Sequence, residues 1–394
     1  MRLGVFSQRA VNSLKQQKVI WLHTVSVGEA QACRILVEDL KRTYPDFRLV
    51  ISTVTETGNK IAQTLIGPQD LVIYSPLDIS FIVRRVINKI SARLFIIAET
   101  EIWPNLIVEL KKRGTPVLLV SGRISPGSFR AYKVIRPFLK EVFQNFSLFC
   151  MQTKDDAQKI ITLGASEDKV KVTGNMKFDS QPALAERSGP GRPDLGLSDE
   201  EKLFIAGSTH RGEEKIILQV YRELIRDYPK LRLLIAPRHI KRVAEIEKLI
   251  SGFGFKSRRI SELNSDDIRY TIYDILILDT IGQLNSLYSY ADIVFIGGSL
   301  IRHGGQNPIE PAVFSKPILF GPYMSNFSSI AKVFLDRSVA IMIKDSRELK
   351  KACVRLLDEP EAGRQLGEKA QELVRENRGA TLRNMQLLGQ LLES

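Results

Sequence analysis

The chain is poor in the residues that build disulfide frameworks and metal clusters. Three of its 394 residues are cysteines, Cys33, Cys150 and Cys353, and they lie far apart with no CxxC spacing. An odd, scattered set of cysteines favours a reducing compartment over a disulfide framework. The four histidines form no cluster with cysteine, and the loops after the expected strands hold no DxD motif. We therefore expect no cofactor and no metal, with Arg and Lys neutralising charge instead.

Long apolar runs and negative charge are also scarce. No stretch of about 18 apolar residues is present, so the sequence predicts no segment that crosses a bilayer, and no signal peptide is visible at the N-terminus. The formal net charge of +13 predicts an anionic partner: nucleic acid, a membrane surface or a phosphorylated substrate. Residues 79–140 hold twelve basic and three acidic residues, so much of the excess lies in the first half.

Apolar, β-branched runs alternate with segments of helical period along the chain. This alternation predicts an α/β fold of parallel sheets with helices on both faces. The expected strands are 18–22, 48–53, 71–74, 92–99, 115–122 and 148–153, then 202–208, 231–237, 273–279, 291–299 and 316–321. Residues 180–201 are rich in Pro, Gly and Ser and predict a linker. The sequence thus predicts two Rossmann-like domains, 1–179 and 202–394, facing a central cleft, with the last helix a candidate to pack back on the first domain.

Two stretches of the second half combine an expected strand end with residues that suit phosphate. Residues 206–214 pass from a strand through small residues into a helix. Ser208 or Thr209 can cap that helix while its amides hold phosphate, and capping alone is an equal alternative. Arg238 follows the next strand, where a guanidinium suits bidentate binding of phosphate or carboxylate. A plain surface arginine is the alternative there.

The segment 297–312 is the most unusual of the second half. Two Gly pairs surround a strand end, and Asn-Pro then opens a helix that carries Glu310. Glycine lets the backbone approach a ligand closely. The Glu310 carboxylate can accept hydrogen bonds from ribose hydroxyls, or it can serve only the helix dipole. Residues 279–284 add a second, weaker Gly turn between a strand and a helix.

Glu29, in the stretch HTVSVGEAQA at residues 23–32, presents a similar choice. It follows an expected strand and opens a helix, so it is either a helix-start acid or a group that does chemistry. We expect the helix N-terminus to lower the pKa of Glu29 and keep the side chain ionised. A carboxylate at a turn that faces a cleft can orient or deprotonate an acceptor hydroxyl.

Seven motifs, in order, carry a resemblance that covers essentially the whole chain. They are HTVSVGE, AETEIWPN, SGRIS, GNMKFD, AGSTH, APRH and GGQNPIEPA. In this set the sequence resembles the 3-deoxy-D-manno-octulosonic acid (Kdo) transferases of Gram-negative bacteria. The resemblance implies a GT-B fold and an inverting glycosyltransferase that moves Kdo from CMP-Kdo to a lipid A precursor in lipopolysaccharide biosynthesis.

The same resemblance implies roles for particular residues. Glu29 matches the general base, and Glu99 and Lys177 match two residues with a transition-state role. Glu99 can equally pin the next loop, and Lys177 can be a surface lysine. The positions implied to bind CMP, beside Ser208 and Thr209, are Pro237, Arg238, Ile281, Gly282, Gln283, Asn307, Pro308, Ile309 and Glu310. A Met-Gly-Glu-like turn is more usual at 281–283, so Gln283 departs from the family pattern in lacking a carboxylate.

The basic first half fits an acceptor that carries phosphates and acyl chains. Residues 122–143 interleave apolar side chains with basic ones, among them Arg123, Arg130, Lys133 and Arg136, and residues 81–90 form a basic amphipathic segment. Such segments bind anionic membrane surfaces, or their apolar positions face the core. The resemblance implies the cytoplasmic face of the inner membrane. Family members usually begin with an apolar anchor helix, which this sequence lacks and which we expect to have been removed.

Two other functions stay open from the residues alone. A nonhydrolysing nucleotide-sugar epimerase also has two Rossmann-like halves, and it would act on a bound UDP-sugar without a lipid acceptor. A nucleic-acid-binding protein is suggested only by the basic composition. No stacking-aromatic module supports that function, so we expect no nucleic-acid partner.

Overall fold

The chain divides into two compact units. A computed structural model describes residues 2–3, 14, 16–179, 191–263 and 273–393. One unit consists of residues 1–180 and 377–394, and the other of residues 181–376. The C-terminal helix therefore belongs to the first unit. Of the predicted linker, residues 180–190 lie outside the described residues, and residues 191–201 belong to the second unit.

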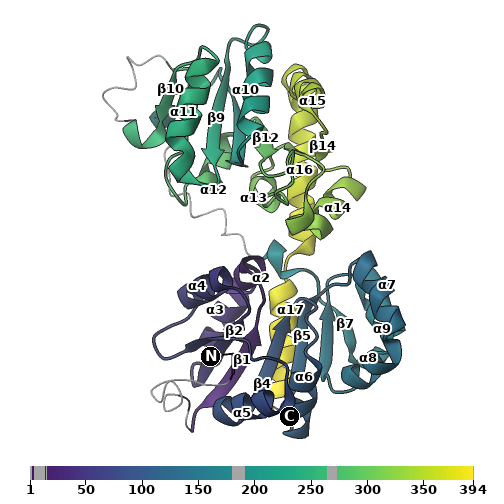
Figure 1. Cartoon of the computed structure of the whole chain (residues 1–394). Coiled ribbons are helices and arrows are strands. Elements are labelled where there is room, and N and C mark those ends of the chain that lie inside the picture. Colours follow the sequence, from purple (N-terminus) through teal and green to yellow (C-terminus); the bar gives the residue numbers. More distant parts are fainter. Residues whose placement is uncertain (1, 4–13, 15, 180–190, 264–272, 394) are drawn as a thin grey trace. The chain divides into compact units, whose positions relative to one another are not determined.

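The first unit is built around a seven-stranded sheet (Figure 1). Its strands are β1 (Lys18–His23), β2 (Phe47–Thr53), β3 (Leu71–Tyr74), β4 (Leu94–Ala98), β5 (Val117–Gly122), β6 (Leu148–Met151) and β7 (Val170–Val172). They lie in the order β3-β2-β1-β4-β5-β6-β7, and all neighbours are parallel. The six predicted strands are confirmed. The short edge strand β7 was not predicted, because VKV carries little apolar signal.

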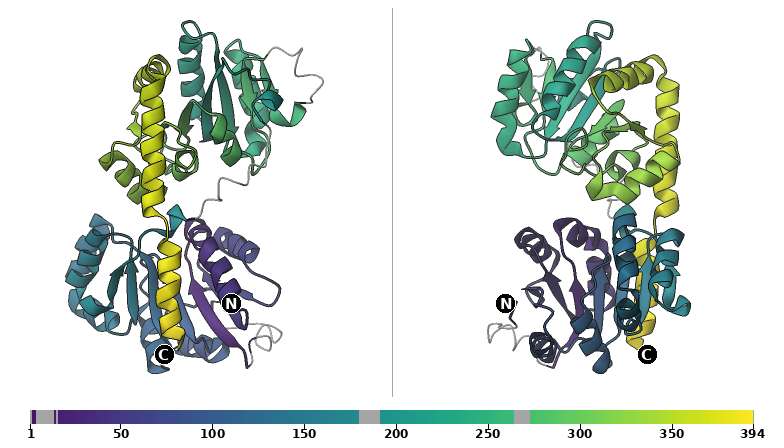
Figure 2. Two further views of the ribbon diagram at one scale, coloured as in Figure 1. Left: turned by 180° about the vertical axis from the view of Figure 1, so that it is seen from behind. Right: turned by 45° about the vertical axis from the view of Figure 1, so that its right-hand side comes forward.

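Helices cover both faces of this sheet, as the alternating pattern predicts. They are α2 (Val27–Ala32), α3 (Arg34–Thr43), α4 (Glu56–Leu65), α5 (Ser80–Ile90), α6 (Pro104–Lys112), α7 (Pro126–Val134), α8 (Arg136–Phe143), α9 (Lys154–Leu163) and α17 (Ala380–Glu393). Trp21 and Phe95 pack with α5, α6, α8 and α9. Ile20 and Leu22 pack on the opposite face with α3 and α17. Figure 2 shows α17, in yellow, lying along that face.

A second seven-stranded parallel sheet forms the core of the other unit. Its strands are β8 (Lys202–Thr209), β9 (Leu231–Pro237), β10 (Ser257–Arg259), β11 (Ile275–Ile277), β12 (Ile293–Ile296), β13 (Ile318–Phe320) and β14 (Ile341–Met342), in the order β10-β11-β9-β8-β12-β13-β14. Its helices are α10 (Glu213–Leu224), α11 (Val243–Gly252), α12 (Leu284–Leu287), α13 (Ile309–Ala312), α14 (Ser328–Asp336), α15 (Ser346–Asp358) and α16 (Pro360–Asn377). The two- and three-residue edge strands β14 and β10 were not predicted. No helix among the described residues is long and apolar enough to span a bilayer.

In both sheets the first strand lies in the interior, and the strand order reverses beside it. β1 lies between β2 and β4, and β8 lies between β9 and β12. At such a switch point the connections diverge to opposite faces, which leaves a crevice at the carboxyl ends of the strands where open α/β sheets bind ligands. Glu29 follows β1 and Glu99 follows β4, whereas Arg238 follows β9 and the Gly-rich segment 297–306 follows β12. The topology therefore places most candidate residues at two switch points.

Candidate functional site

Glu29 lies in the first turn of α2, just beyond the carboxyl end of β1. Ser26 caps this helix, and its Oγ accepts a hydrogen bond from the Glu29 amide at 3.4 Å. The Glu29 carboxylate in turn accepts hydrogen bonds from the Val25 amide at 2.6 Å and from the Ser26 hydroxyl at 3.1 Å. These reciprocal bonds resemble a capping box and hold the carboxylate at the edge of the sheet. Glu29 is therefore a helix-start acid, whatever else it does.

The pKa of Glu29 moves in the direction opposite to the one expected. Burial raises the pKa to about 7, and the charges of Glu99 and Glu101 add to this, while the hydrogen bonds from Val25 and Ser26 oppose it. The expectation of a lowered pKa is therefore wrong, because loss of hydration outweighs the start of a six-residue helix. A carboxyl group that titrates near neutral pH is suited to proton transfer.

Glu99 follows β4 and binds two cations that come from other strand ends. Its carboxylate accepts hydrogen bonds from Lys177 Nζ at 3.0 Å and from Arg123 Nε at 2.8 Å. The side chains of Glu99 and Lys177 are only 10% and 12% exposed, so Lys177 is not a surface lysine. Glu99 itself has a φ of 55°, a conformation that is rare outside glycine and that aims its side chain from the strand end. The structure therefore brings Glu99, Lys177 and Arg123 into one ionic cluster.

Two more titratable side chains belong to this region, and the sequence analysis missed both. Burial and then the charge of Glu99 raise the pKa of Glu101. Burial and then the charge of Glu101 raise the pKa of Tyr132, on α7. The signal for Glu101 was present as the second acid of AETE, but only the first had an assigned role. Three carboxyl groups that interact electrostatically therefore gather near the carboxyl ends of β1 and β4.

The basic residues predicted to meet a lipid acceptor separate into two groups. Arg123 pairs with Glu99, as described above. Arg130, Lys133 and Arg136 lie on α7 and α8, and α7 has no buried residue. The apolar neighbours Val134 and Phe138 are 82% and 52% exposed. An exposed surface of mixed basic and apolar character therefore exists on α7 and α8.

The loop after β12 is held by Glu213, a residue that the sequence analysis did not single out. Glu213 is fully buried in the first turn of α10. Its carboxylate accepts hydrogen bonds from four backbone amides, those of His210, Gly298, Ser299 and Leu300, at 2.7–3.0 Å. Burial still raises the pKa of Glu213, and the amide bonds oppose the shift. These loop amides are thus occupied by a carboxylate of the protein itself.

Ser208 and Thr209 do not cap α10, and that prediction is wrong. The helix begins after Gly212, which offers no side chain. Thr209 is fully buried and donates its hydroxyl hydrogen to Glu214 at 3.0 Å. Ser208 has a φ of 55° and is partly exposed. A Cβ on Gly297 would lie 2.3 Å from the Ser208 carbonyl oxygen, so only glycine permits this close approach of the two strand ends.

Arg238, Asn307 and Glu310 form a second polar group at the same end of this sheet. The Asn307 side chain accepts a hydrogen bond from the Ile309 amide at 3.1 Å and donates one to Glu310 at 3.4 Å. Burial raises the pKa of Glu310 to about 7, while the Asn307 hydrogen bond and the positive charge of Arg238 lower it. Pro308 is the N-cap residue of α13. The predicted nucleotide residues that follow β9 and β12 therefore interact with one another.

The turn at 281–283 follows β11, the neighbour of β9 in the sheet. Ile281 is 83% exposed, and Gly282 has a φ of 94° that requires glycine or strain. Gln283 accepts a hydrogen bond from the Thr280 hydroxyl at 2.5 Å. This turn, beside the end of β9, thus exposes the apolar side chain of Ile281, and the hydrogen bond from Thr280 holds the side-chain amide of Gln283 in place.

Three of the four histidines gather at this end of the second unit, a grouping that the sequence did not predict. The rings of His210 and His303 stack with centroids 4.3 Å apart, and His239 meets His210 edge-on at 5.8 Å. Burial lowers the pKa of His210 to about 4, and the neighbouring positive charges of His303, His239 and Arg238 contribute. Within the described residues no group of three or more His, Cys, Asp or Glu is arranged to hold a metal ion.

Comparisons with known proteins give one family and consistent relatives. Residues 1–180 match the family described as 3-deoxy-D-manno-octulosonic-acid transferase (kdotransferase). The chain is 34% identical to a 3-deoxy-D-manno-octulosonic acid transferase of Haemophilus influenzae, over 95% of this chain and 87% of that protein. It is 33% identical to the protein of that name from Chlamydophila psittaci, over 87% and 78% of the two chains.

Solved structures of low sequence identity share the fold. A glycosyltransferase from Rickettsia africae has a TM-score of 0.60 at 13% identity, covering 96% of this chain and all of that one. A UDP-GlcNAc 2-epimerase from Neisseria meningitidis has a TM-score of 0.58 at 12% identity, covering 93% and 100%. At these identities the likeness establishes the architecture and not the reaction. The predicted GT-B fold of two Rossmann-like parallel sheets is confirmed.

Proposed function

Because this chain belongs to the Kdo transferase family, we propose that it transfers Kdo with Glu29 as the base that deprotonates the acceptor hydroxyl. The chain is a glycosyltransferase of lipopolysaccharide biosynthesis. The proposal adds that the donor is CMP-Kdo, that the acceptor is a lipid A precursor, and that named residues bind each of them. The observation that carries it is the partly buried Glu29 carboxyl at the end of β1, with a pKa of about 7.

The proposed reaction is a single inverting displacement. The acceptor hydroxyl gives its proton to Glu29 as its oxygen forms a bond to the anomeric carbon of Kdo. The bond from that carbon to the phosphate oxygen breaks on the opposite face, and CMP leaves with the electron pair. A lower pKa would leave more of the base ionised but make it a weaker base, and a higher pKa would do the reverse. A pKa near the working pH is therefore the best compromise between the two. The hydrogen bonds from Val25 and Ser26 fix the direction of the carboxylate before the substrate arrives.

The Glu99 cluster supplies positive charge to the same reaction. Lys177 and Arg123 both bind the Glu99 carboxylate, which keeps two cations near the carboxyl ends of the strands. We assign to Lys177 the stabilisation of negative charge that develops on the leaving phosphate or on the Kdo carboxylate, in place of a metal ion. Glu99 holds the ammonium group in position. Its rare backbone conformation is the kind of strain that accumulates at functional sites.

The second unit is proposed to hold the CMP moiety. Arg238 would bind the phosphate, and Glu310 would accept hydrogen bonds from the ribose hydroxyls. The turn at 281–283 would contact the base through its backbone and through the exposed Ile281. Ser208, Pro237 and the segment 307–309 complete the proposed CMP contacts. Thr209 contributes through its backbone, because its hydroxyl is already bonded to Glu214.

The surface of α7 and α8 is proposed to meet the lipid acceptor in an anionic membrane. Arg130, Lys133 and Arg136 would contact phosphates, and the exposed Val134 and Phe138 would enter the interfacial layer. The second basic segment, α5, buries most of its apolar positions, so there the core explains the pattern. This surface accounts for the proposed location at the cytoplasmic face of the inner membrane.

The experiment that tests the proposal compares Kdo transfer from CMP-Kdo to tetra-acylated lipid A precursor by the parent protein, Glu29→Gln and Glu56→Gln. Glu56 is the matched control, because it is an exposed first-turn acid of the helix that follows β2. We expect Glu29→Gln to lose about 10³-fold in rate and to keep CMP affinity, and Glu56→Gln to match the parent. Equal activity of Glu29→Gln would refute the role of the base, and a parent without transfer or CMP binding would refute the substrates.

A further inference from the structure

The second unit contains an apolar cavity with basic residues at its mouth, and the proposed function does not use it. The cavity lies at the carboxyl end of β13, between the loop that follows it, α14 and β14, and has a volume of about 670 Å³. This volume falls within the range of small-molecule sites. Every residue that lines it belongs to the second unit. The cavity therefore does not depend on how the two units are placed.

The wall of the cavity is suited to a flexible hydrocarbon chain. Its apolar side chains include Phe320, Met324, Leu335 and Met342. Met342 is 39% exposed, although it is an apolar residue on an edge strand. Methionine side chains adapt to irregular apolar ligands. The hydroxyl groups of a sugar acid would lose water against this wall and find too few hydrogen-bond partners in return. A sugar therefore fits the cavity less well than a hydrocarbon chain does.

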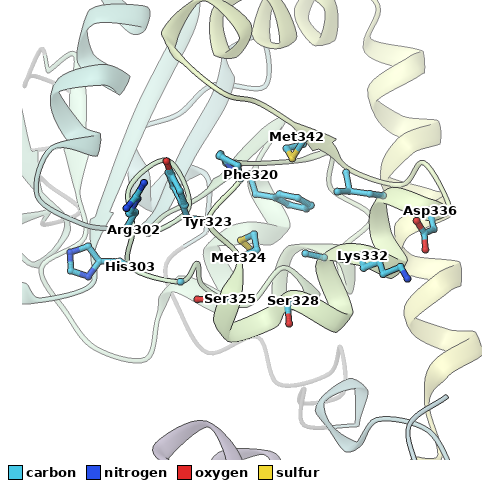
Figure 3. A pocket seen from close by; sticks show the side chains of 15 residues that line it. Arg302, His303, Phe320, Tyr323, Met324, Ser325, Ser328, Lys332, Asp336 and Met342 are labelled. Carbon is cyan, nitrogen blue, oxygen red and sulfur yellow. The ribbon is translucent and has the colours of Figure 1, made fainter. Parts of the chain in front are cut away.

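The charged groups at the mouth are suited to an anion. Arg302 and Lys332 are both exposed, and neither has an ion-pair partner among the described residues. Figure 3 shows Phe320, Met324 and Met342 between these two cations in the view drawn. The guanidinium of Arg302 lies 5.7 Å from the centre of the Tyr323 ring, which places it at the rim. One acid, Asp336, also lines the cavity, so the net charge of its rim is positive.

We propose that this cavity binds an acyl chain of an anionic lipid, with the headgroup phosphate on Arg302 and Lys332. The apolar wall would bury the acyl chain, and the two cations at the mouth, which have no ion-pair partner among the described residues, would bind the phosphate. His303 lines the cavity and also stacks on His210, which interacts electrostatically with Arg238, so one proposed donor residue lies near the histidine pair at the edge of the cavity. The inference goes beyond the proposed function, which places the lipid contact on α7 and α8.

The test uses the full chain, without donor, and monomeric dihexanoyl phosphatidic acid as the probe. Methionine methyl groups labelled with ¹³C report the site, because Met324 and Met342 line the cavity while Met151 and Met176 are buried in the first unit. We expect the signals of Met324 and Met342 to shift on titration while those of Met151 and Met176 stay. Dihexanoyl phosphatidylcholine should bind about fivefold more weakly, since it has no net charge. Inorganic phosphate and free Kdo should not shift the signals.

Two variants test the two halves of the site separately. Met342→Glu places a charge on the apolar wall and should weaken probe binding about tenfold, whereas Leu382→Glu, at an exposed leucine of the first unit, should not. Lys332→Glu should weaken binding of the phosphatidic acid about fivefold, with Lys369→Glu on α16 as its control. If Met342→Glu perturbs the fold, as judged from the Met151 and Met176 signals, the exposed Lys332 variant decides.

Several results would overturn this inference. No shift at Met324 and Met342, or unchanged affinity in both variants, would exclude an acyl site. Equal shifts with inorganic phosphate would indicate a simple anion site, and shifts with free Kdo would indicate a sugar site instead. Because the probe is measured without CMP-Kdo, any of these results leaves the test of Glu29 unaffected. Loss of transfer in Glu29→Gln likewise says nothing about this cavity.

Discussion

Glu29 and Glu213 occupy the same place in the two sheets, beyond the interior strand where the strand order reverses, yet their carboxylates have different surroundings. Each lies in the first turn of the helix that follows the strand at the switch point. Glu29 accepts two hydrogen bonds and is partly exposed. Glu213 is fully buried and accepts four from backbone amides. The comparison suggests a simple rule for an acid in the first turn of a helix. A carboxylate whose oxygens are fully used by backbone amides has a structural role, whereas one with few such bonds remains available for chemistry.

The charge at the two switch points differs in the same sense. In the first unit burial, and then the charge of Glu99, raise the pKa of both Glu29 and Glu101. In the second unit Arg238 supplies positive charge, whereas burial lowers the pKa of His210 to about 4 and leaves its ring neutral near pH 7. A base needs the first environment, and an anionic nucleotide needs the second. One fold can therefore carry a candidate base in one unit and a candidate anion site in the other through the residues at its loops.

The largest effect is expected from Glu213→Gln. The amide nitrogen of Gln would face backbone N–H groups, so at least one buried donor loses its partner along with the charge. We expect the free energy of unfolding of the second unit to fall by about 3 kcal/mol, together with CMP affinity. Thermal unfolding and CMP titration measure both, with the exposed Glu361→Gln as the control. If the Glu213→Gln protein is as stable as the parent, Glu213 is not a structural carboxylate, and the contrast with Glu29 is wrong.

The next effect concerns the cation that Glu99 holds. Lys177→Met keeps the length of the side chain and removes its charge, and we expect the rate of Kdo transfer to fall about 10²-fold. Lys171→Met, on the exposed edge strand β7, is the matched control and should keep the parent's rate. A steady-state assay of both variants makes the measurement. If the two variants are equally active, Lys177 serves only to neutralise Glu99.

A smaller effect links the pKa of Glu29 to stability. The pKa of this group rises on folding, from 4.5 to about 7. The unfolded chain therefore releases the proton first, and the parent loses stability as the pH rises from 4.5 to about 7. Glu29→Gln has no such loss, so it should gain about 2 kcal/mol over the parent between pH 5 and pH 8, allowing for partial exposure. Urea unfolding at both pH values tests this, and parallel curves would contradict the raised pKa.

The smallest effect is expected at the basic surface of the first unit. Arg136→Gln should reduce binding to vesicles that contain anionic lipid by about fivefold, near 1 kcal/mol, at moderate salt. Because exposed charges are screened, the difference should shrink as salt rises. Co-sedimentation with vesicles measures it, and Arg378→Gln, at the basic residue between α16 and α17, serves as a control. Equal loss in both variants would mean that general charge, and not the α7–α8 surface, binds the membrane.

The sequence predicted the fold for identifiable reasons, but it did not predict that Arg123 and Lys177 both bind Glu99. Continuous apolar runs mark buried parallel strands, whereas β7, β10 and β14 are short edge strands without that signal. Glu29, Glu99 and Lys177 were found through motifs. The direction of the Glu29 pKa was missed, because burial depends on the folded surroundings. Glu213 was missed because RGEEK has the same pattern as any helix start, and three of the four amides that it binds, those of Gly298, Ser299 and Leu300, are distant in the sequence.

The dependence of kcat/KM on pH, for Kdo transfer by the parent and by Glu29→Gln, tests the central claim most directly. The account predicts that the parent's activity rises about tenfold per pH unit below a midpoint near 7 and then levels, as Glu29 loses its proton. Glu29→Gln should be at least about 10²-fold slower, without this ascending limb. A flat profile for the parent, or the same limb in Glu29→Gln, would contradict the claim that Glu29 is the base.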